Sequence, residues 1–306
     1  MHRHTLLSLL ILGLATGSLA QYASSKVILD PTYRTVPPPH GDYPQDPDHV
    51  RVVSIVLSAI SLTFVGISLR ESKYWNSTVP AALTIGSVTF TLAEAINCYL
   101  GNVYWTTSHD PSNRMFTLLG RDFETYVGII WWSYGAVLSC GIFGALNRNI
   151  GTGKLWALLG FAGFLDIVLE ECLLTYGGIY TYYGHQPLVV NVFPLWWAFC
   201  NVSSIFVGVS IAYRYRDLLE GWGSCFVPVL LPLCYVGPQV LAALPTIYAI
   251  QADYSPFVTQ LCGIATCVLA VVQVGVVMDC VLMRDQTSGS QVGRDVKSQK
   301  AHQRLF

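Results

Sequence analysis

Charged residues are scarce in this chain of 306 residues, since only 11% of them are Asp, Glu, Lys or Arg. Soluble domains carry roughly a quarter of such residues, whereas 53% of the residues here are hydrophobic. The net charge is −1, and no basic cluster precedes the last two dozen positions, which excludes a nucleic-acid-binding surface. A long disordered chain is excluded by the same composition. A polytopic membrane protein or an unusually apolar soluble protein remains.

Metal-binding motifs are also lacking. No His lies in an apolar stretch, and no Asp-rich motif is present that would hold Mg²⁺ and a diphosphate. The nine Cys residues lie inside apolar runs without a CxxC pair, a pattern typical of small buried side chains rather than of a zinc site or a disulfide framework. We therefore expect no metal site and no cofactor.

The amino-terminal residues resemble a targeting sequence. Arg3 and two His residues precede an apolar run over 6–14, and small residues follow up to Ala20. This order predicts a signal peptide over 1–20, with an uncleaved anchor as the alternative. Either one places 21–49, a segment rich in Pro, Tyr and Asp, on the lumenal side.

Seven apolar stretches then follow, each long enough to span a bilayer, for which about 20 apolar residues suffice. They cover 51–69, 79–100, 125–146, 155–176, 195–213, 224–249 and 256–283. With a lumenal start, eleven Lys and Arg residues fall on the cytoplasmic side and five on the lumenal side, in agreement with the positive-inside rule. The sequence thus predicts an all-α, multi-pass membrane protein with seven transmembrane helices over 50–283. Its amino terminus would be lumenal and its tail, 284–306, cytoplasmic.

Three carboxyl groups fall deep inside these stretches. At a rise of about 1.5 Å per residue, Glu94, Asp166 and Glu170 lie roughly 22, 17 and 23 Å from the cytoplasmic ends of their helices. Asp166 and Glu170 are four residues apart and share a helix face, whereas Glu171 points elsewhere. Asn201 enters from the lumenal side to a depth of about 9 Å. Their common depth predicts one shared chamber.

Such groups admit three interpretations. They could be polar contacts between helices, or parts of a proton or cation path. The third interpretation is general acid catalysis. Since no basic residue lies deep in any stretch, burial favours the uncharged form of these carboxyls, and a protonated carboxyl in an apolar chamber can act as a general acid.

Aromatic residues accompany the acids. Some belong to an interfacial belt, and others could stabilise a positive charge through their ring faces. They gather near the lumenal helix ends at Tyr99, Tyr104, Trp105, Tyr176, Tyr180, Tyr182, Tyr183, Trp196 and Trp197, with Trp131 and Trp132 at similar depth.

One stretch carries a family resemblance. Asp166, Glu170 and Glu171 precede the run GGIYTYYGHQP at 177–187, which is followed by PLWW at 194–197 and by Asn201; Glu94 and Asn97 lie upstream. This arrangement, over roughly 85–205, resembles the integral-membrane terpene cyclases of fungal meroterpenoid pathways, most closely the macrophorin and ascofuranone type. The leader and the long external segment depart from the shorter members of that group, which leaves the subfamily and the substrate open.

The resemblance implies a metal-independent enzyme of the endoplasmic reticulum membrane that protonates an alkene or epoxide of a hydrophobic, farnesyl-type precursor. Glu170, or else Asp166, would be the acid, and Glu94 would orient it or take the final proton. Seven side chains would surround the substrate: Asn97, Asn201, Trp131, Trp132, Trp196, Trp197 and Tyr180. A seven-helix receptor or small-solute transporter is the alternative, followed by a sterol-type isomerase. The expected surroundings are the lipid bilayer and the small-molecule substrate, with no nucleic acid; protein partners stay open.

Overall fold

The computed structural model describes residues 45–108, 110–173, 178–252 and 254–302, with side chains described as far as 280. The predicted signal peptide over 1–20 and most of the predicted lumenal segment over 21–49 lie outside the described residues.

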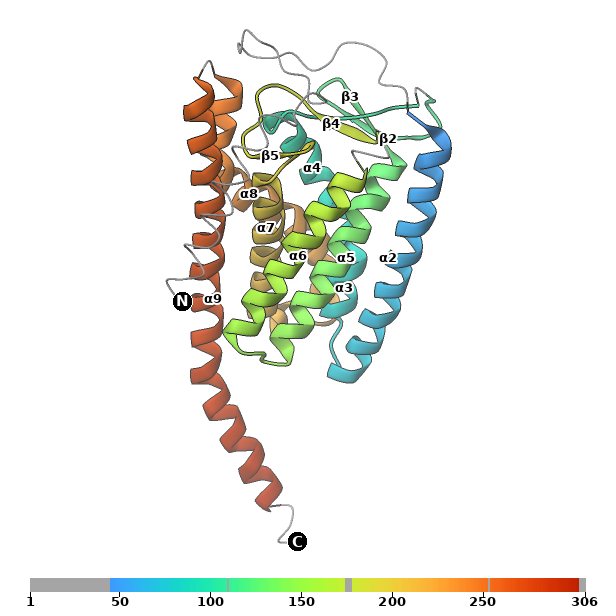
Figure 1. Ribbon diagram of the computed structural model, residues 1–306. Helices are drawn as coiled ribbons and strands as arrows, with labels where there is room; N and C mark the ends of the chain where they lie inside the picture. The colour runs from blue at the N-terminus through green and yellow to red at the C-terminus, as the bar shows by residue number, and fades with distance from the viewer. Residues whose placement is uncertain (1–44, 109, 174–177, 253, 303–306) are drawn as a thin grey trace.

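A bundle of helices forms the body of the molecule (Figure 1). The α-helices are α2 (Pro47–Trp75), α3 (Val79–Gly86), α4 (Phe90–Leu100), α5 (Thr125–Asn147), α6 (Thr152–Cys172), α7 (Trp196–Arg214), α8 (Val227–Gln251) and α9 (Pro256–His302). Short 3-10 helices are η2 (Ser87–Thr89), η4 (Arg216–Leu219) and η5 (Gly221–Phe226).

Six segments of the described chain are long and apolar enough to cross a membrane, which fits a multi-pass membrane protein. They are Pro47–Trp75, Val79–Leu100, Thr125–Asn147, Trp196–Arg214, Gly221–Gln251 and Pro256–Cys280. The predicted fourth stretch forms α6, a helix of 21 residues that is not among these six. Beyond the predicted end of the last stretch at 283, α9 continues as a helix to His302.

The second predicted stretch is divided by a tighter turn. The hydroxyl of Ser87 donates to the Leu83 carbonyl at 2.7 Å, and that of Thr89 donates to the Gly86 carbonyl at 2.7 Å. Hydroxyl groups that compete for helix carbonyls in this way favour local departures from α-helical geometry. The α3, η2 and α4 segments therefore follow one another within a single apolar span.

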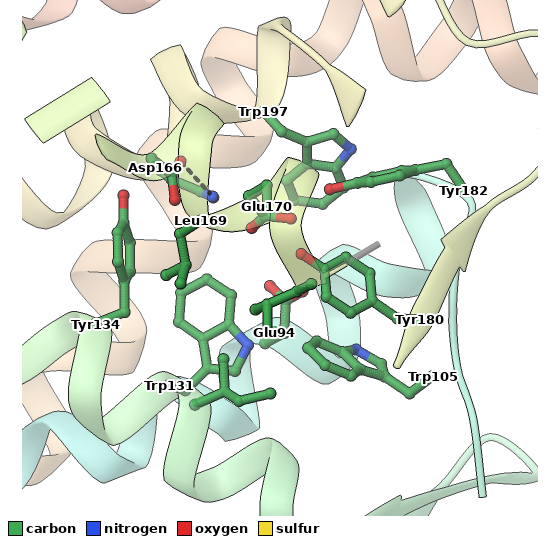
Figure 2. A pocket seen from close by; sticks show the side chains of 13 residues that line it. Glu94, Trp105, Trp131, Tyr134, Asp166, Leu169, Glu170, Tyr180, Tyr182 and Trp197 are labelled. Atoms are coloured by element: carbon green, nitrogen blue, oxygen red, sulfur yellow. Dashed lines mark hydrogen bonds between the residues drawn. The ribbon is translucent and has the colours of Figure 1, made fainter. Parts of the chain in front are cut away.

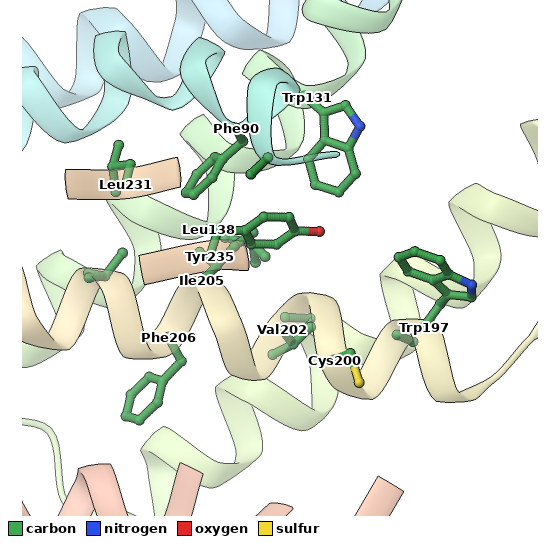
Figure 3. Close-up of a cluster of buried hydrophobic side chains, with 14 of the residues drawn as sticks. Phe90, Trp131, Leu138, Trp197, Cys200, Val202, Ile205, Phe206, Leu231 and Tyr235 are labelled. Atoms are coloured by element: carbon green, nitrogen blue, oxygen red, sulfur yellow. The ribbon is translucent and has the colours of Figure 1, made fainter. Parts of the chain in front are cut away.

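The centre of the bundle is α7, because 89% of its apolar, membrane-spanning part is buried inside the molecule. Figure 3 shows Ile205 of α7 beside Tyr235 of α8, with Phe90 and Trp131 close by. The Tyr235 ring lies 5.2 Å from that of Phe90 and 5.3 Å from that of Trp131. A Cβ atom at Gly135 would lie 2.5 Å from the Phe90 ring, so the missing side chain lets α5 approach α4. By contrast, α6 is peripheral, since its buried residues are only Leu155, Leu159, Ala162 and Asp166.

Short strands gather at one end of the bundle, where they form a cap made of residues 101–108, 110–124 and 178–195 (Figure 1). Strand β1 (Val103–Trp105) pairs antiparallel with β4 (Tyr180–Tyr182), β2 (Arg114–Leu118) with β3 (Arg121–Glu124), and β5 (Val189–Val190) with β6 (Phe193–Pro194). The all-α prediction is therefore wrong for these two connections. Their Tyr, Trp, Val and Phe residues favour extended backbone, and β1 of one connection finds its partner strand, β4, in the other.

Arg121 fastens the cap to the bundle. Its guanidinium donates to the Val103 carbonyl at 2.7 Å and to the Tyr183 hydroxyl at 2.5 Å. The same group lies 4.0 Å above the centre of the Tyr99 ring at the end of α4. These contacts hold both cap connections and α4 in one arrangement.

Candidate functional site

Beneath the cap, side chains of α4, α5, α6, α7, β1 and β4 enclose a cavity (Figure 2). We call it the chamber. It contains about 420 Å³ of space not filled by atoms, part of it open to the outside. Its lining consists of Glu94, Trp105, Ile130, Trp131, Tyr134, Asp166, Leu169, Glu170, Leu173, Tyr180, Tyr182, Trp197 and Asn201.

The three predicted acids meet in this chamber from two helices. Glu94 of α4 is 3% exposed and Asp166 of α6 is 2% exposed. Glu170 follows Asp166 by four residues, so both carboxyls lie on the same side of α6, and Figure 2 shows Glu170 between Asp166 and Glu94. The hydroxyl of Tyr134 points towards Asp166 from α5 (Figure 2).

Two of the acids are held by hydrogen bonds. Asn201 donates from Nδ2 to Oδ2 of Asp166 at 3.3 Å. The Asn201 carbonyl oxygen accepts in turn from the Tyr235 hydroxyl at 2.8 Å and from Nε2 of Gln239 at 3.4 Å. Asp166 is thereby tied to the bundle centre through a fixed amide.

Glu94 is held from the cap side. Its Oε1 accepts a hydrogen bond from the thiol of Cys98 at 3.2 Å. The Cys98 sulfur accepts from Nε1 of Trp105 at 3.0 Å. One oxygen of Glu94 is therefore occupied, while Oε2 is buried without a hydrogen-bond partner in the described part of the chain.

Further polar atoms of the chamber wall are buried without a hydrogen-bond partner in the part of the chain that the structure describes. They are Oε2 of Glu170, Nε1 of Trp131 and Nε1 of Trp197. Leaving such a group unpaired costs about 1–3 kcal/mol, and buried polar groups in folded proteins are normally paired with protein or water. Their concentration around one cavity marks the chamber as a place for water or a ligand.

No side chain of Lys, Arg or His lines the chamber within the described residues. Arg121 lies in the cap, where backbone carbonyls and the Tyr99 and Tyr183 side chains surround it. The chamber therefore combines three acids with no basic partner in its wall.

Aromatic rings form the rest of the wall. Trp105 lies 4.4 Å from Tyr180, and Tyr182 lies 5.9 Å from Trp197, measured between ring centres. Trp131 faces them from α5 (Figure 2). The ring faces carry partial negative charge.

No family model, curated protein or solved structure matches the chain.

Seven of the ten residues predicted for the site lie around the chamber: Glu94, Asp166, Glu170, Asn201, Trp131, Trp197 and Tyr180. The other three do not line it. Trp132 donates from Nε1 to the Thr84 carbonyl at 3.1 Å, and Trp196 donates to Oε1 of Gln186 at 3.2 Å. Trp196 also stacks on Trp197 at 4.6 Å and so supports the wall from behind. Asn97 is buried on α4, outside the lining.

Six lining residues were not among the predicted site residues: Trp105, Ile130, Tyr134, Leu169, Leu173 and Tyr182. Trp105 and Tyr182 belong to the aromatic group noted in the sequence, but only the pairing of β1 with β4 brings them together. Tyr134 follows Trp131 by three residues, a spacing that places both on one helix face and that could have identified it.

Two other acids lie apart from the chamber lining. Glu171 accepts from Nδ2 of Asn191 at 2.8 Å and from the Phe193 amide at 3.2 Å, which ties α6 to the β5–β6 pair. Asp279 is exposed on α9. Among the described residues, no group of three or more His, Cys, Asp or Glu side chains is arranged to hold a metal ion.

In the cap, burial shifts two titrating groups. It lowers the pKa of His185, and it raises the pKa of Tyr183 against the opposing effect of the Arg121 hydrogen bond. Both residues are therefore uncharged at neutral pH.

Proposed function

We propose that this chain is a membrane-bound, metal-independent terpene cyclase whose active site is the chamber. The carrying observation is a pair of buried carboxyl oxygens, on Glu94 and Glu170, that have no hydrogen-bond partner among the described residues, in an aromatic wall to which those residues contribute no Lys, Arg or His. An acid that must donate a proton to a weakly basic alkene needs an unoccupied oxygen directed at the substrate. The resemblance of the motif around Asp166 and Glu170 to membrane terpene cyclases supports the same function.

The hydrogen bonds suggest a division of roles. Glu170 is the proton donor, because its Oε2 has no partner among the described residues and its carboxyl lies between those of Asp166 and Glu94 (Figure 2). Asp166, which is fixed by Asn201, lies one turn away and orients Glu170 or returns a proton to it. Glu94, held at one oxygen by Cys98, accepts the last proton at the other.

The reaction balances without an outside reagent. The O–H bond of Glu170 breaks as a C–H bond forms at the terminal alkene, or as an epoxide oxygen is protonated and its C–O bond opens. Internal double bonds attack the resulting carbocation, and the final cation loses a proton to Glu94. Return of that proton to Glu170 restores the enzyme. Trp105, Trp131 and Trp197 stabilise the moving charge through their ring faces.

The proposal includes a seventh transmembrane helix, α6, with the cap on the lumenal side and the carboxyl terminus in the cytoplasm. The proposed location is the endoplasmic reticulum membrane, in keeping with the signal peptide predicted over 1–20. The substrate is a farnesyl-type chain on an aromatic or polyketide head.

Membranes from a yeast host that expresses the chain test this function. They are incubated in D₂O with farnesylated phenols that carry either a terminal alkene or a terminal epoxide, and the products are resolved by mass spectrometry. Alkene protonation gives a cyclic isomer with one solvent deuteron on carbon, and epoxide opening gives a cyclic alcohol without that carbon-bound deuteron. Conversion of neither substrate by well-expressed protein, with or without added Mg²⁺, would contradict the proposal.

A further inference from the structure

The chamber contains carboxyl groups and ring faces, and no positively charged side chain of the described residues lines it. Three acids and six aromatic residues line it, and no Lys, Arg or His does so within the described residues. A buried carboxylate is strongly destabilising unless a cation or hydrogen-bond donors compensate it. The ligand that completes such a site is one that brings the cation itself.

The unpartnered atoms locate this cation. Oε2 of Glu94 and Oε2 of Glu170 are both buried and free of hydrogen bonds in the described part of the chain, and Figure 2 shows the two carboxyls directed into the same space. Trp131 is 5% exposed, and its ring borders that space.

The lining distinguishes an organic cation from a metal ion. Metal ions such as Mg²⁺ require several oxygen ligands in a regular shell, and most of this wall consists of indole, phenol and aliphatic groups that offer no such ligands. Ring faces instead attract large, weakly hydrated ammonium groups. Ile130, Leu169 and Leu173 add an aliphatic side to the chamber, which suits an alkyl chain attached to the nitrogen.

We propose that the chamber binds lipophilic tertiary amines in their ammonium form, with the nitrogen between Glu94 and Glu170 and the alkyl chain along Ile130, Leu169 and Leu173. Such a ligand takes the place of the carbocation in the proposed reaction, so the inference rests in part on that function. It also stands alone as a statement about ligand binding, because it needs no turnover.

The test compares a charged ligand with a neutral one of the same shape. N,N-dimethyldodecylamine and 2-methyltetradecan-2-ol are added at equal mole fraction to the full-length chain in maltoside micelles, and the midpoint of thermal unfolding is followed. A ligand that binds only the folded state raises this midpoint with concentration. We expect the amine to raise it, with at least ten-fold higher affinity than the alcohol.

Variants separate charge recognition from hydrophobic binding. Glu94→Gln and Glu170→Gln should each weaken amine binding at least ten-fold and leave alcohol binding unchanged. Trp131→Phe should weaken amine binding less than Trp131→Leu does, because a ring face remains. Asp279→Asn, on the exposed side of α9, is the matched control and should bind the amine like the natural chain.

Equal stabilisation by amine and alcohol, or full amine binding by both Glu variants, would overturn the inference. The outcomes also separate it from the proposed function. Amine selectivity without conversion of any prenylated substrate would support a cation-binding site and contradict the cyclase. Conversion of a prenylated substrate without amine selectivity would support the cyclase and contradict the cation-binding site.

Discussion

The thiol of Cys98 donates a hydrogen bond to Oε1 of Glu94 at 3.2 Å. The two residues are one helical turn apart on α4, and the sulfur is itself fixed by the Trp105 indole of the cap. Glu94 therefore presents a defined oxygen, Oε2, to the chamber. The cap strand β1 and the acid are linked through a single side chain.

Cys98 is thus a positioning residue for Glu94. Cys98→Ser keeps a donor and an acceptor in place and should retain turnover within about two-fold, whereas Cys98→Val loses a bond worth about 1 kcal/mol and should lower kcat about five-fold. Turnover of the prenylated substrate in membranes measures both. Equal rates for the Ser and Val variants would show that the thiol does not orient Glu94.

Glu170→Gln preserves shape and removes the acid. We expect kcat to fall by about 10²–10⁴, as is typical when a general acid is lost, with unchanged protein level in the membrane. Asp279→Asn removes a carboxyl from the exposed face of α9 and should leave kcat unchanged. Normal turnover by Glu170→Gln would move the role of proton donor to Asp166.

Gly101 allows Trp197 to reach the chamber wall. A Cβ atom at this position would lie 2.2 Å from Cζ2 of Trp197 and 3.1 Å from the Asn97 carbonyl. Gly101→Ala should therefore lower the free energy of unfolding by about 1–3 kcal/mol, as overpacking does. Gly160→Ala on α6, where no atom lies within 4 Å of the added methyl group, should be neutral or stabilising by about 0.5–1 kcal/mol. Thermal unfolding in micelles compares the two, and equal midpoints would contradict the close approach.

The cap should lose stability in mild acid. Burial lowers the pKa of His185 in the folded chain, so below the ordinary value of about 6.5 the unfolded chain binds a proton that the folded chain does not. Stability that is present above this pH is then lost as the pH falls towards the lowered folded value. Unfolding midpoints between pH 7.5 and 5 should decline, and His185→Gln should reduce that decline. An unchanged decline in this variant would assign the effect to other groups.

Orientation can be tested at both ends of the chain. Asn76, Ser77 and Thr78 form an acceptor sequence for glycosylation at the end of α2 away from the cap, and the proposed topology places them in the cytoplasm. We expect no glycan on Asn76 and a cytoplasmic signal from a reporter fused after Phe306. A glycan on Asn76 would show that this residue is lumenal and that the proposed orientation is wrong.

Hydropathy predicted the six apolar spans that the structure contains, and helix geometry predicted that the acids lie at one level. Because an α-helix rises by a constant amount per residue, counting from the ends of the spans predicts one level for Glu94, Asp166 and Glu170, and all three line the chamber. The same counting could not predict which of Trp131 and Trp132 lines the chamber. Neighbouring residues point about 100° apart, and the side of α5 that faces the bundle depends on its partners.

The cap could not be predicted in this way. Residue Trp105 pairs with Tyr180 across 75 positions, and no local pattern specifies such a distant partner. Half of the chamber's aromatic wall depends on that pairing, so Trp105 and Tyr182 entered the site only through the structure.

The closed cap also determines how affinity for this protein should be expressed. Paired strands cover the chamber at one end, and α6, which forms one wall, exposes Phe161, Phe164, Leu165 and Val168 on its outer side. A hydrophobic ligand dissolves in the surrounding lipid, where its concentration depends on partitioning rather than on the amount added to the buffer. Doubling the lipid at a fixed amount of ligand should halve occupancy in the dilute limit, so KM and Kd are constants only when written as mole fractions of the bilayer.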